Sequence, residues 1–334
     1  MNESTIGRGK IRDISLTAPI SNVRIAEVAG TGFASQRLAG FSQSVRTLGY
    51  LILLTKPAIM FMVLFTGAAA LIVEGNLVNQ PLKFLLFLLG LYMTGGAANA
   101  FNQYFERDID KRMLRTSSRR PLPMGKISPW SAVLFSIILG TSGVALLAVT
   151  FNILTAGLSL ATILFYSLFY TLWLKPNTSQ NIVIGGIAGA MAPIGAWAAA
   201  TGETSLVCWL MFLIIFFWTP PHFWALALKF RDDYDKVKLP MLPNVKGEVS
   251  ALTQISIHAS LLFMTSGLLF VFWGGWLFGV SAVGLGVIFA IKIIKAWRYK
   301  SSEAYWGIFK FSLIYLFGLF MAIIGDAVLK RFLI

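Results

Sequence analysis

The chain has 334 residues, of which 57% are hydrophobic and only 13% are charged. A soluble domain keeps about a quarter of its residues charged, so water is not the main solvent of this chain. Its 28 Lys and Arg against 14 Asp and Glu give a net charge of +14, yet no soluble fold with a basic face accompanies that charge to indicate nucleic acid binding. The single cysteine, Cys208, excludes an internal disulfide and a thiolate metal site.

Residues 1–48 form a polar N-terminal segment that is rich in Ser and Gly. They contain no apolar core of the signal-peptide type. Their Arg and Ser content resembles that of an organellar transit peptide, but Glu3, Asp13 and Glu27 are unusual in one. We therefore expect a poorly ordered cytoplasmic tail, and we favour a bacterial inner membrane over a mitochondrial one for the rest of the chain.

Nine apolar segments follow the tail, each long enough to cross about 30 Å of hydrocarbon at about 1.5 Å per residue. Their expected bounds are 49–73, 84–106, 130–149, 152–173, 181–200, 205–228, 251–273, 276–297 and 308–328. These segments are too many for a buried soluble core. The sequence therefore predicts an all-α polytopic membrane protein, in which residues 49–334 fold as one domain of nine transmembrane helices.

Basic residues gather in alternate loops. Seven lie between the second and third segments, five between the sixth and seventh, and four near the end of the eighth, whereas the loops on the opposite side hold only Lys83. By the positive-inside rule, the basic loops and the N-terminus are cytoplasmic. Nine crossings then leave the C-terminus outside.

Small residues concentrate inside the segments, notably Gly95 and Gly96 in the second and Gly185 and Gly186 in the fifth. Small residues on a helix surface let two backbones approach closely, so we expect a tightly packed bundle. This pattern concerns packing and carries no chemistry.

Acidic residues are rare in this chain, so their placement is informative. A first cluster at the end of the second segment, residues 102–110, reads Asn-Gln-Tyr-Phe-Glu-Arg-Asp-Ile-Asp. If the helix continues, Asn102, Glu106 and Asp110 share one face, and Asp108 points the opposite way. One amide and two carboxylates in a row at a membrane surface suit a hard divalent cation such as Mg²⁺.

A second acidic cluster, residues 230–236, follows the sixth segment on the same side and reads Phe-Arg-Asp-Asp-Tyr-Asp-Lys. A bundle can bring the two clusters face to face, where they would repel each other unless cations bridged them. Basic residues that suit phosphate oxygens surround both clusters, namely Arg115, Arg119, Arg120, Lys229 and Arg231. The combination indicates a diphosphate site; solvated loop charges in surface ion pairs are the simpler alternative.

These residues resemble a known family. The row Asn102, Glu106 and Asp110 is similar to the first aspartate-rich motif, Asn-x-x-x-Asp/Glu-x-x-x-Asp, of the UbiA-like intramembrane prenyltransferases, which share a nine-helix fold. Three stretches are similar to the branch of this family that farnesylates haem: residues 107–123, Trp-Thr-Pro-Pro-His-Phe-Trp-Ala-Leu-Ala at 218–227, and Pro-Met-Leu-Pro at 240–243. The resemblance covers the chain from about residue 49 to the C-terminus.

The resemblance implies an enzyme that transfers the farnesyl group of farnesyl diphosphate to the 2-vinyl group of haem B. The products would be haem O and diphosphate, on the way to haem A, with a downstream haem A synthase as a candidate partner. Mg²⁺ is the implied cofactor. A membrane-embedded chamber lined by aromatic side chains would shield the allylic cation from water.

The resemblance also implies roles for individual residues. Mg²⁺ would be held by Glu106, Asp110, Asp232 and Asp233, and the catalytic set would be Asn102, Glu106, Asp110 and Asp233. The diphosphate would be bound by Arg115, Arg119, Lys229 and Arg231.

One departure from the family pattern concerns the sixth segment. Aromatic prenyltransferases of the family carry an Asp-x-x-x-Asp motif there, and this sequence has His222 and Lys229 instead. The second set of metal ligands is therefore open, with Asp233 preferred over Asp235. His222 follows two prolines at an expected helix break, where its imidazole could bind or orient haem iron. An ordinary interhelical hydrogen bond is the alternative for His222.

Three other polar residues stand alone in apolar surroundings. Lys56, within the first segment, is either a functional intramembrane lysine or a side chain that snorkels to the interface. His258 fits a hydrogen-bonded residue of the seventh segment. Asp326, four residues before Lys330, fits an ion pair at a helix end.

Two alternative functions remain open at this point. An enzyme of the same family could prenylate a quinone precursor or a porphyrin-like pigment. An assay with such an acceptor in place of haem would distinguish this function from haem farnesylation. A multi-span transporter would place ionisable residues near the bilayer midplane at broken helices, and the central parts of the nine segments are nearly free of them.

Overall fold

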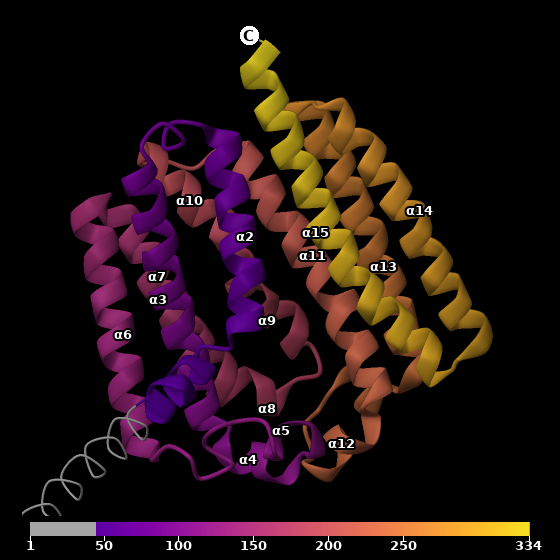
Figure 1. Ribbon diagram of the computed structural model, residues 1–334. Helices are drawn as coiled ribbons and strands as arrows, with labels where there is room; N and C mark the ends of the chain where they lie inside the picture. The colour runs from indigo at the N-terminus through magenta and orange to yellow at the C-terminus, as the bar shows by residue number, and fades with distance from the viewer. Residues whose placement is uncertain (1–44, 334) are drawn as a thin grey trace, which may run out of the picture. The chain divides into compact units, whose positions relative to one another are not determined.

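The computed structural model describes residues 45–333, of which residues 47–333 belong to one compact unit. Every regular element in the described part is a helix (Figure 1). The tail expected for residues 1–48 falls almost entirely outside the described residues, so its order stays a prediction.

Nine of the described helices are long and apolar enough to cross a membrane, which confirms the nine predicted segments. They are α2 (Pro57–Glu74), α3 (Pro81–Phe105), α6 (Pro129–Thr150), α7 (Ile153–Leu164) with η1 (Phe165–Leu174) and α8 (Lys175–Asn177), α9 (Asn181–Ala190) with α10 (Ala192–Thr201), α11 (Leu206–Lys229), α13 (Leu242–Trp273), α14 (Trp276–Tyr299) and α15 (Ser302–Leu333). The chain is an integral, multi-pass membrane protein.

Three short helices connect the spans at one end of the bundle. They are α4 (Arg107–Arg112), α5 (Leu114–Ser117) and α12 (Arg231–Lys236). Figure 1 shows them together with α8 at the bottom of the bundle, opposite the C-terminal end of α15. Both acidic clusters therefore lie at the same end, as the sequence predicts.

Close helix packing depends on glycine at several contacts. Between α3 and α6, a Cβ added at Gly90 would lie 2.6 Å from a methyl group of Leu147, and one added at Gly143 would lie 2.8 Å from the Cβ of Met93. Side chains at these positions would push the two helices apart. The predicted tight packing is confirmed at these contacts.

The first membrane span begins later than the sequence predicts. A short helix, Val45–Leu54, ends before Lys56, and α2 starts at Pro57 rather than continuing from residue 49. Lys56 has φ 54° and ψ 67°, in the left-handed region, and so lies outside the right-handed helical conformation that the following proline disfavours. Lys56 therefore lies at the entrance to the span and not within it.

The expected ion pair between Asp326 and Lys330 is wrong, because each side chain has a partner on another helix. The carboxylate of Asp326 accepts hydrogen bonds from the backbone N–H groups of Phe278 (2.6 Å) and Leu277 (3.3 Å), which begin α14. The ammonium of Lys330 donates to the carbonyl of Trp273 (2.6 Å) and lies 3.9 Å from its ring centroid. Both residues of α15 thus fix the connection between α13 and α14.

Replacing Asp326 with Ala is expected to lower the free energy of unfolding by about 1–3 kcal/mol, because buried N–H groups at the start of α14 lose their acceptor. Thermal unfolding of the detergent-purified protein measures the effect. Asp108→Ala is the control, since that side chain is 70% exposed and its loss should change the free energy by less than about 0.5 kcal/mol. Equal midpoints for the two variants would contradict a stabilising role for this cap.

Candidate active site

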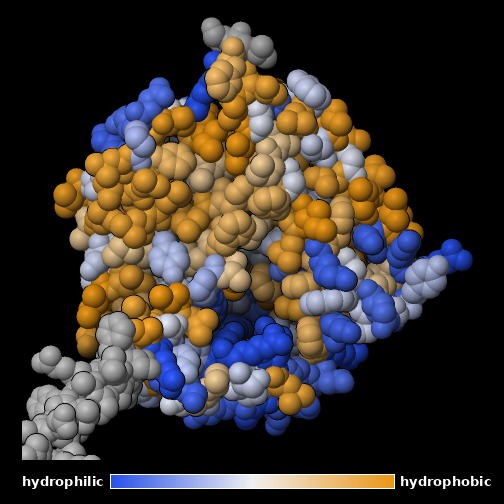
Figure 2. Space-filling view, in the orientation of Figure 1, coloured by the Kyte–Doolittle hydropathy of each residue, from blue (hydrophilic) through white to orange (hydrophobic). Residues whose placement is uncertain are grey.

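A cavity of about 550 Å³ lies within the bundle. Side chains from α2, α3, α7, η1, α9, α11 and α15 line it, and most of them are apolar, including Ile59, Met62, Leu91, Leu158, Ile215 and Leu316. Figure 2 shows the molecule hollowed on one face, with hydrophilic residues gathered below the hollow and hydrophobic residues above it. The cavity is therefore a mainly apolar chamber with one polar end.

The first acidic cluster forms the floor of this polar end. Although α3 ends at Phe105, the Glu106 N–H donates to the Asn102 carbonyl (3.0 Å) and the Asp110 N–H donates to the Glu106 carbonyl (2.8 Å), so the helical spacing continues. Asn102, Glu106 and Asp110 are buried and line the cavity, whereas Asp108 is exposed on the other side. The predicted shared face is confirmed.

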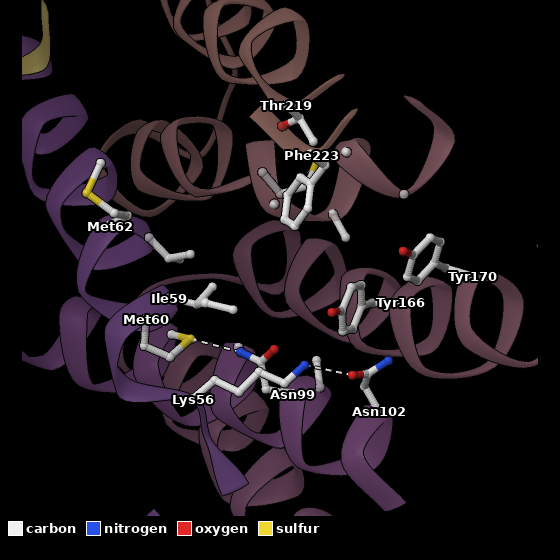
Figure 3. A pocket seen from close by; sticks show the side chains of 18 of the residues that line it. Lys56, Ile59, Met60, Met62, Asn99, Asn102, Tyr166, Tyr170, Thr219 and Phe223 are labelled. Carbon is white, nitrogen blue, oxygen red and sulfur yellow. Dashed lines mark hydrogen bonds between the residues drawn. The ribbon is translucent and has the colours of Figure 1, made fainter. Parts of the chain in front are cut away.

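Cations from three other parts of the chain neutralise these carboxylates. Lys175 forms an ion pair with Glu106, and Arg120 forms one with Asp110 and approaches Glu106 at 3.4 Å. The ammonium of Lys56 donates to the side-chain carbonyl of Asn102 at 2.7 Å (Figure 3). The Asn102 amide in turn donates to Glu106 (2.8 Å), so one continuous network joins the six side chains.

The charge states follow from this network. Burial opposes ionisation of Glu106, but the positive charges of Lys175, Lys56 and Arg120 outweigh it and lower the pKa of Glu106 to about 2. Burial and the neighbouring Arg120 lower the pKa of Lys56 to about 7, against the opposing attraction of Glu106. Burial works against the charge of Arg120, yet Asp110 and Glu106 raise its pKa overall. Glu106 is therefore a carboxylate at neutral pH.

Lys175 is a site residue that sequence reasoning missed. It follows η1, a π-helix whose backbone bonds span five residues, and its own N–H donates to the Tyr170 carbonyl. In an α-helix, at about 100° per residue, Lys175 would point roughly 140° away from Tyr170. The wider helix brings both to the cavity. The only sequence signal is a lone lysine at the end of the fourth apolar segment.

Two tyrosines of η1 form part of the cavity wall. The rings of Tyr166 and Tyr170 stack with centroids 5.3 Å apart, and Figure 3 shows their hydroxyl ends turned into the cavity. Tyr170 fits only because its neighbour on α9 is glycine: a Cβ at Gly185 would lie 2.3 Å from the Tyr170 ring. The small residues of the fifth segment thus make room for an aromatic side chain at the site.

The second acidic cluster contributes differently from the first. Asp233 is buried, and its two carboxylate oxygens accept hydrogen bonds from the backbone N–H groups of Leu114 (3.0 Å) and Arg115 (3.2 Å) at the start of α5. Asp232 is exposed, and Asp235 accepts a hydrogen bond from the Asn244 amide. None of these three carboxylates is among the residues that line the cavity. Their metal-binding role stays a prediction.

The basic residues predicted to bind diphosphate do not all lie at the cavity. Arg115 lines the cavity, and its buried Nε atom lacks a hydrogen-bond partner. Arg120, which the sequence places among the basic residues suited to phosphate oxygens, lines the cavity as well. Lys229 donates to the Ser302 hydroxyl (2.6 Å), whereas Arg119 and Arg231 are exposed. Of the four residues expected to bind diphosphate, the structure brings only Arg115 to the cavity.

His222 lines the cavity from α11, which runs through Pro220 and Pro221 without the expected break. Its ring stacks on Trp218 and Phe309, with centroids 4.5 and 4.4 Å away, and its Nδ1 lies 2.7 Å from the Ser312 hydroxyl. Because the one Ser312 proton is donated to the Phe309 carbonyl, the oxygen accepts from Nδ1–H of His222. The lone pair of the neutral imidazole is thus on Nε2. The interhelical hydrogen bond is present, and the second ring nitrogen stays available.

His258 lies outside the cavity lining, on α13. Its Nδ1 lies 2.9 Å from the Gln254 carbonyl and its ring packs edge-on against Trp224. This arrangement agrees with a hydrogen-bonded structural histidine, as the sequence favours.

Sequence comparison identifies relatives over most of the chain. The model of the UbiA prenyltransferase family matches residues 63–322. The protoheme IX farnesyltransferase of Synechocystis sp. is 44% identical over 282 residues, which cover 82% of this chain and 87% of that protein. Protoheme IX farnesyltransferase 2 of Mesorhizobium japonicum is 40% identical over 307 residues, which cover 88% and 94%.

Solved structures share the fold. A digeranylgeranylglyceryl phosphate synthase superposes with a TM-score of 0.71 at 20% identity, over 85% of this chain and 99% of that one. A UbiA homolog from Archaeoglobus fulgidus, bound to DMAPP and Mg²⁺, superposes with a TM-score of 0.62 at 17% identity, over 82% and 98%. By the matching family model, the close relatives and this common fold, the chain belongs to the UbiA prenyltransferase family.

Proposed function

We propose that this protein transfers the farnesyl group of farnesyl diphosphate to the 2-vinyl group of haem B. Water then supplies the hydroxyl group, and the products are diphosphate and haem O for haem A synthesis. One observation carries the proposal: a mainly apolar intramembrane cavity ends in two buried carboxylates among four cations. The long apolar part suits a prenyl chain, and the charged end suits its diphosphate. The names of the relatives support haem B as the acceptor.

The residues at the polar end fit Mg²⁺. Glu106 and Asp110 are both within reach of one guanidinium, Arg120, so their oxygens converge on a small volume, and carboxylate oxygens are the ligands that Mg²⁺ prefers. Asn102 adds an amide oxygen beside them. Bound Mg²⁺ would neutralise charge that develops on the leaving diphosphate.

The chain's own cations would complete the site. Arg115 and Arg120 are suited to bidentate contact with diphosphate oxygens, and Lys56 and Lys175 supply further charge at the same end of the cavity. Loss of the diphosphate leaves an allylic cation, which the apolar walls protect from water. The faces of Tyr166 and Tyr170 add π-electron density that stabilises a cation.

His222 is the candidate contact to haem. Its hydrogen bond to Ser312 fixes the ring and leaves the lone pair of Nε2 for haem iron. The stacked rings of Trp218 and Phe309 present a flat apolar wall beside it.

Membership of an enzyme family argues against the transporter alternative. We further propose a bacterial inner membrane location with the basic loops cytoplasmic.

The proposal is tested by incubating the purified full-length protein with haem B, farnesyl diphosphate and Mg²⁺, followed by mass analysis of the extracted haem. A haem whose mass has increased by one farnesyl and one hydroxyl group is expected, and a chelator should abolish its formation. Release of pyrophosphate with unchanged haem would make haem B the wrong acceptor. A quinone precursor assayed in parallel would then identify the alternative.

Replacing Glu106 or Asp110 with Ala is expected to lower turnover by at least about 10²-fold, since each loses a carboxylate at the diphosphate end. Initial rates of haem O formation measure the loss. Asp108→Ala lies in the same short stretch but faces away from the cavity, so it serves as the matched control. Full activity of either site variant would contradict the assignment.

Replacing His222 with Ala is expected to weaken haem B binding by about tenfold or more while leaving the affinity for farnesyl diphosphate within about twofold. Absorbance titration with haem and a separate binding assay with farnesyl diphosphate distinguish the two effects. An unchanged haem titration would return His222 to a purely structural role.

A further inference from the structure

The charged end of the cavity contains fewer carboxylates and more cations than a site for several metal ions requires. Among the residues that line it, Glu106 and Asp110 are the two carboxylates, and Lys56, Lys175, Arg115 and Arg120 are the four cations. No group of three or more His, Cys, Asp or Glu side chains in the described part of the chain is arranged to hold a metal ion. A divalent cation beyond the first would have no lining carboxylate of its own and would depend on substrate oxygens and water.

Charge balance argues against a second Mg²⁺. Four cations against two carboxylates leave at most two positive charges in excess at the buried end of the cavity, since Lys56 is only partly protonated near neutral pH. A prenyl diphosphate brings about three negative charges near neutral pH. One Mg²⁺ then leaves the occupied site within about one charge of neutrality, and each further Mg²⁺ adds two uncompensated charges where the dielectric constant is low.

In the second acidic cluster, Asp233 already binds the backbone at the start of α5. Both oxygens of Asp233 accept hydrogen bonds from the first backbone N–H groups of α5, which is the element that carries Arg115 into the cavity. Freeing Asp233 for a metal ion would leave these two N–H groups without their acceptor and release Arg115 from its position. Asp232, beside it, is exposed and outside the cavity lining.

Two lysines bring further positive charge to Asn102 and Glu106. Lys175 and Lys56 approach the row from η1 and from the start of α2, and they contact Glu106 and Asn102 respectively. Their ammonium groups are compact charges on flexible side chains, so they can exchange these partners for phosphate oxygens when the substrate arrives.

Resting on the proposed function, we infer that this site works with a single Mg²⁺, held by Glu106 and Asp110, and that Lys56 and Lys175 supply the charge that a second metal ion would supply. Asp233 is a positioning residue: it holds Arg115 at the diphosphate and does not bind the metal.

The test counts metal ions in the full-length protein with Mn²⁺ in place of Mg²⁺. Equilibrium binding and electron paramagnetic resonance are measured at saturating farnesyl thiolodiphosphate, an unreactive diphosphate analogue. One Mn²⁺ per chain, with no spin coupling between metal ions, is expected. Two coupled Mn²⁺ ions would overturn the inference and leave the proposed function intact. Absence of any bound Mn²⁺ would instead contradict the metal site of the proposed function.

Matched variants assign the residues. Asp110→Asn is expected to weaken Mn²⁺ binding by at least tenfold, whereas Asp108→Asn, with the same change of charge two residues away, should leave it unchanged. Asp233→Ala should keep one Mn²⁺ but weaken binding of the analogue, and Asp233→Asn, which retains one acceptor oxygen, should restore part of that affinity. A second Mn²⁺ ion that disappears in both Asp233 variants would make Asp233 a ligand.

The role of Lys175 has a separate readout. Lys175→Gln is expected to retain one Mn²⁺ per chain and to bind the analogue about tenfold or more weakly, because it loses a charged contact to the diphosphate. Elution as a single species in size-exclusion chromatography checks that the variant is folded. If folded Lys175→Gln bound the analogue with unchanged affinity, the inference that the lysines supply charge to the diphosphate would be overturned.

Discussion

The structure depends on the cost of burying ionised carboxylates at the edge of a membrane. Glu106 and Asp110 are almost inaccessible to solvent, and an unpaired carboxylate there would be strongly destabilising. The cations that compensate them arrive from distant parts of the sequence: Lys56 before α2, Arg120 after α5 and Lys175 after η1. The convergence of these elements at one end of the bundle is therefore an electrostatic requirement, and it creates the charged end of the cavity.

Departures from regular α-helix produce that convergence. Proline after Lys56 ends the preceding helix, so that the ammonium points at Asn102 from the entrance of the span. The π-helix η1 changes the register at Tyr170 and turns Lys175 toward Glu106. Gly185 accommodates the Tyr170 ring against α9. Irregular backbone is costly in a membrane unless its polar groups find partners, and here it lines the functional cavity.

The cavity joins two environments that prenyl transfer needs. Its charged end can stabilise an anionic leaving group, and its apolar walls exclude water from the carbon skeleton. The two histidines differ in kind: His222 lies in the cavity wall with a fixed ring and a nitrogen lone pair, and His258 bonds to its own helix. The two acidic clusters differ as well, since one faces the cavity and the other caps the loop that delivers Arg115.

The sequence by itself determined the nine spans and the common face of Asn102, Glu106 and Asp110, because hydrophobic length and helical spacing are local properties that a linear pattern records. The family was indicated by the resemblance of its motifs to those of known members. Only the tertiary structure decided which charges meet. Lys175 and Glu106 are 69 residues apart and are joined through a π-helical register that no α-helical periodicity reveals. Similarly, Arg119 and Arg120 are indistinguishable in a basic loop, yet Arg120 alone of the two reaches the carboxylates. Asp233 turns to the backbone of α5 because packing brings unpaired N–H groups within its reach, and the sequence contains no sign of that contact.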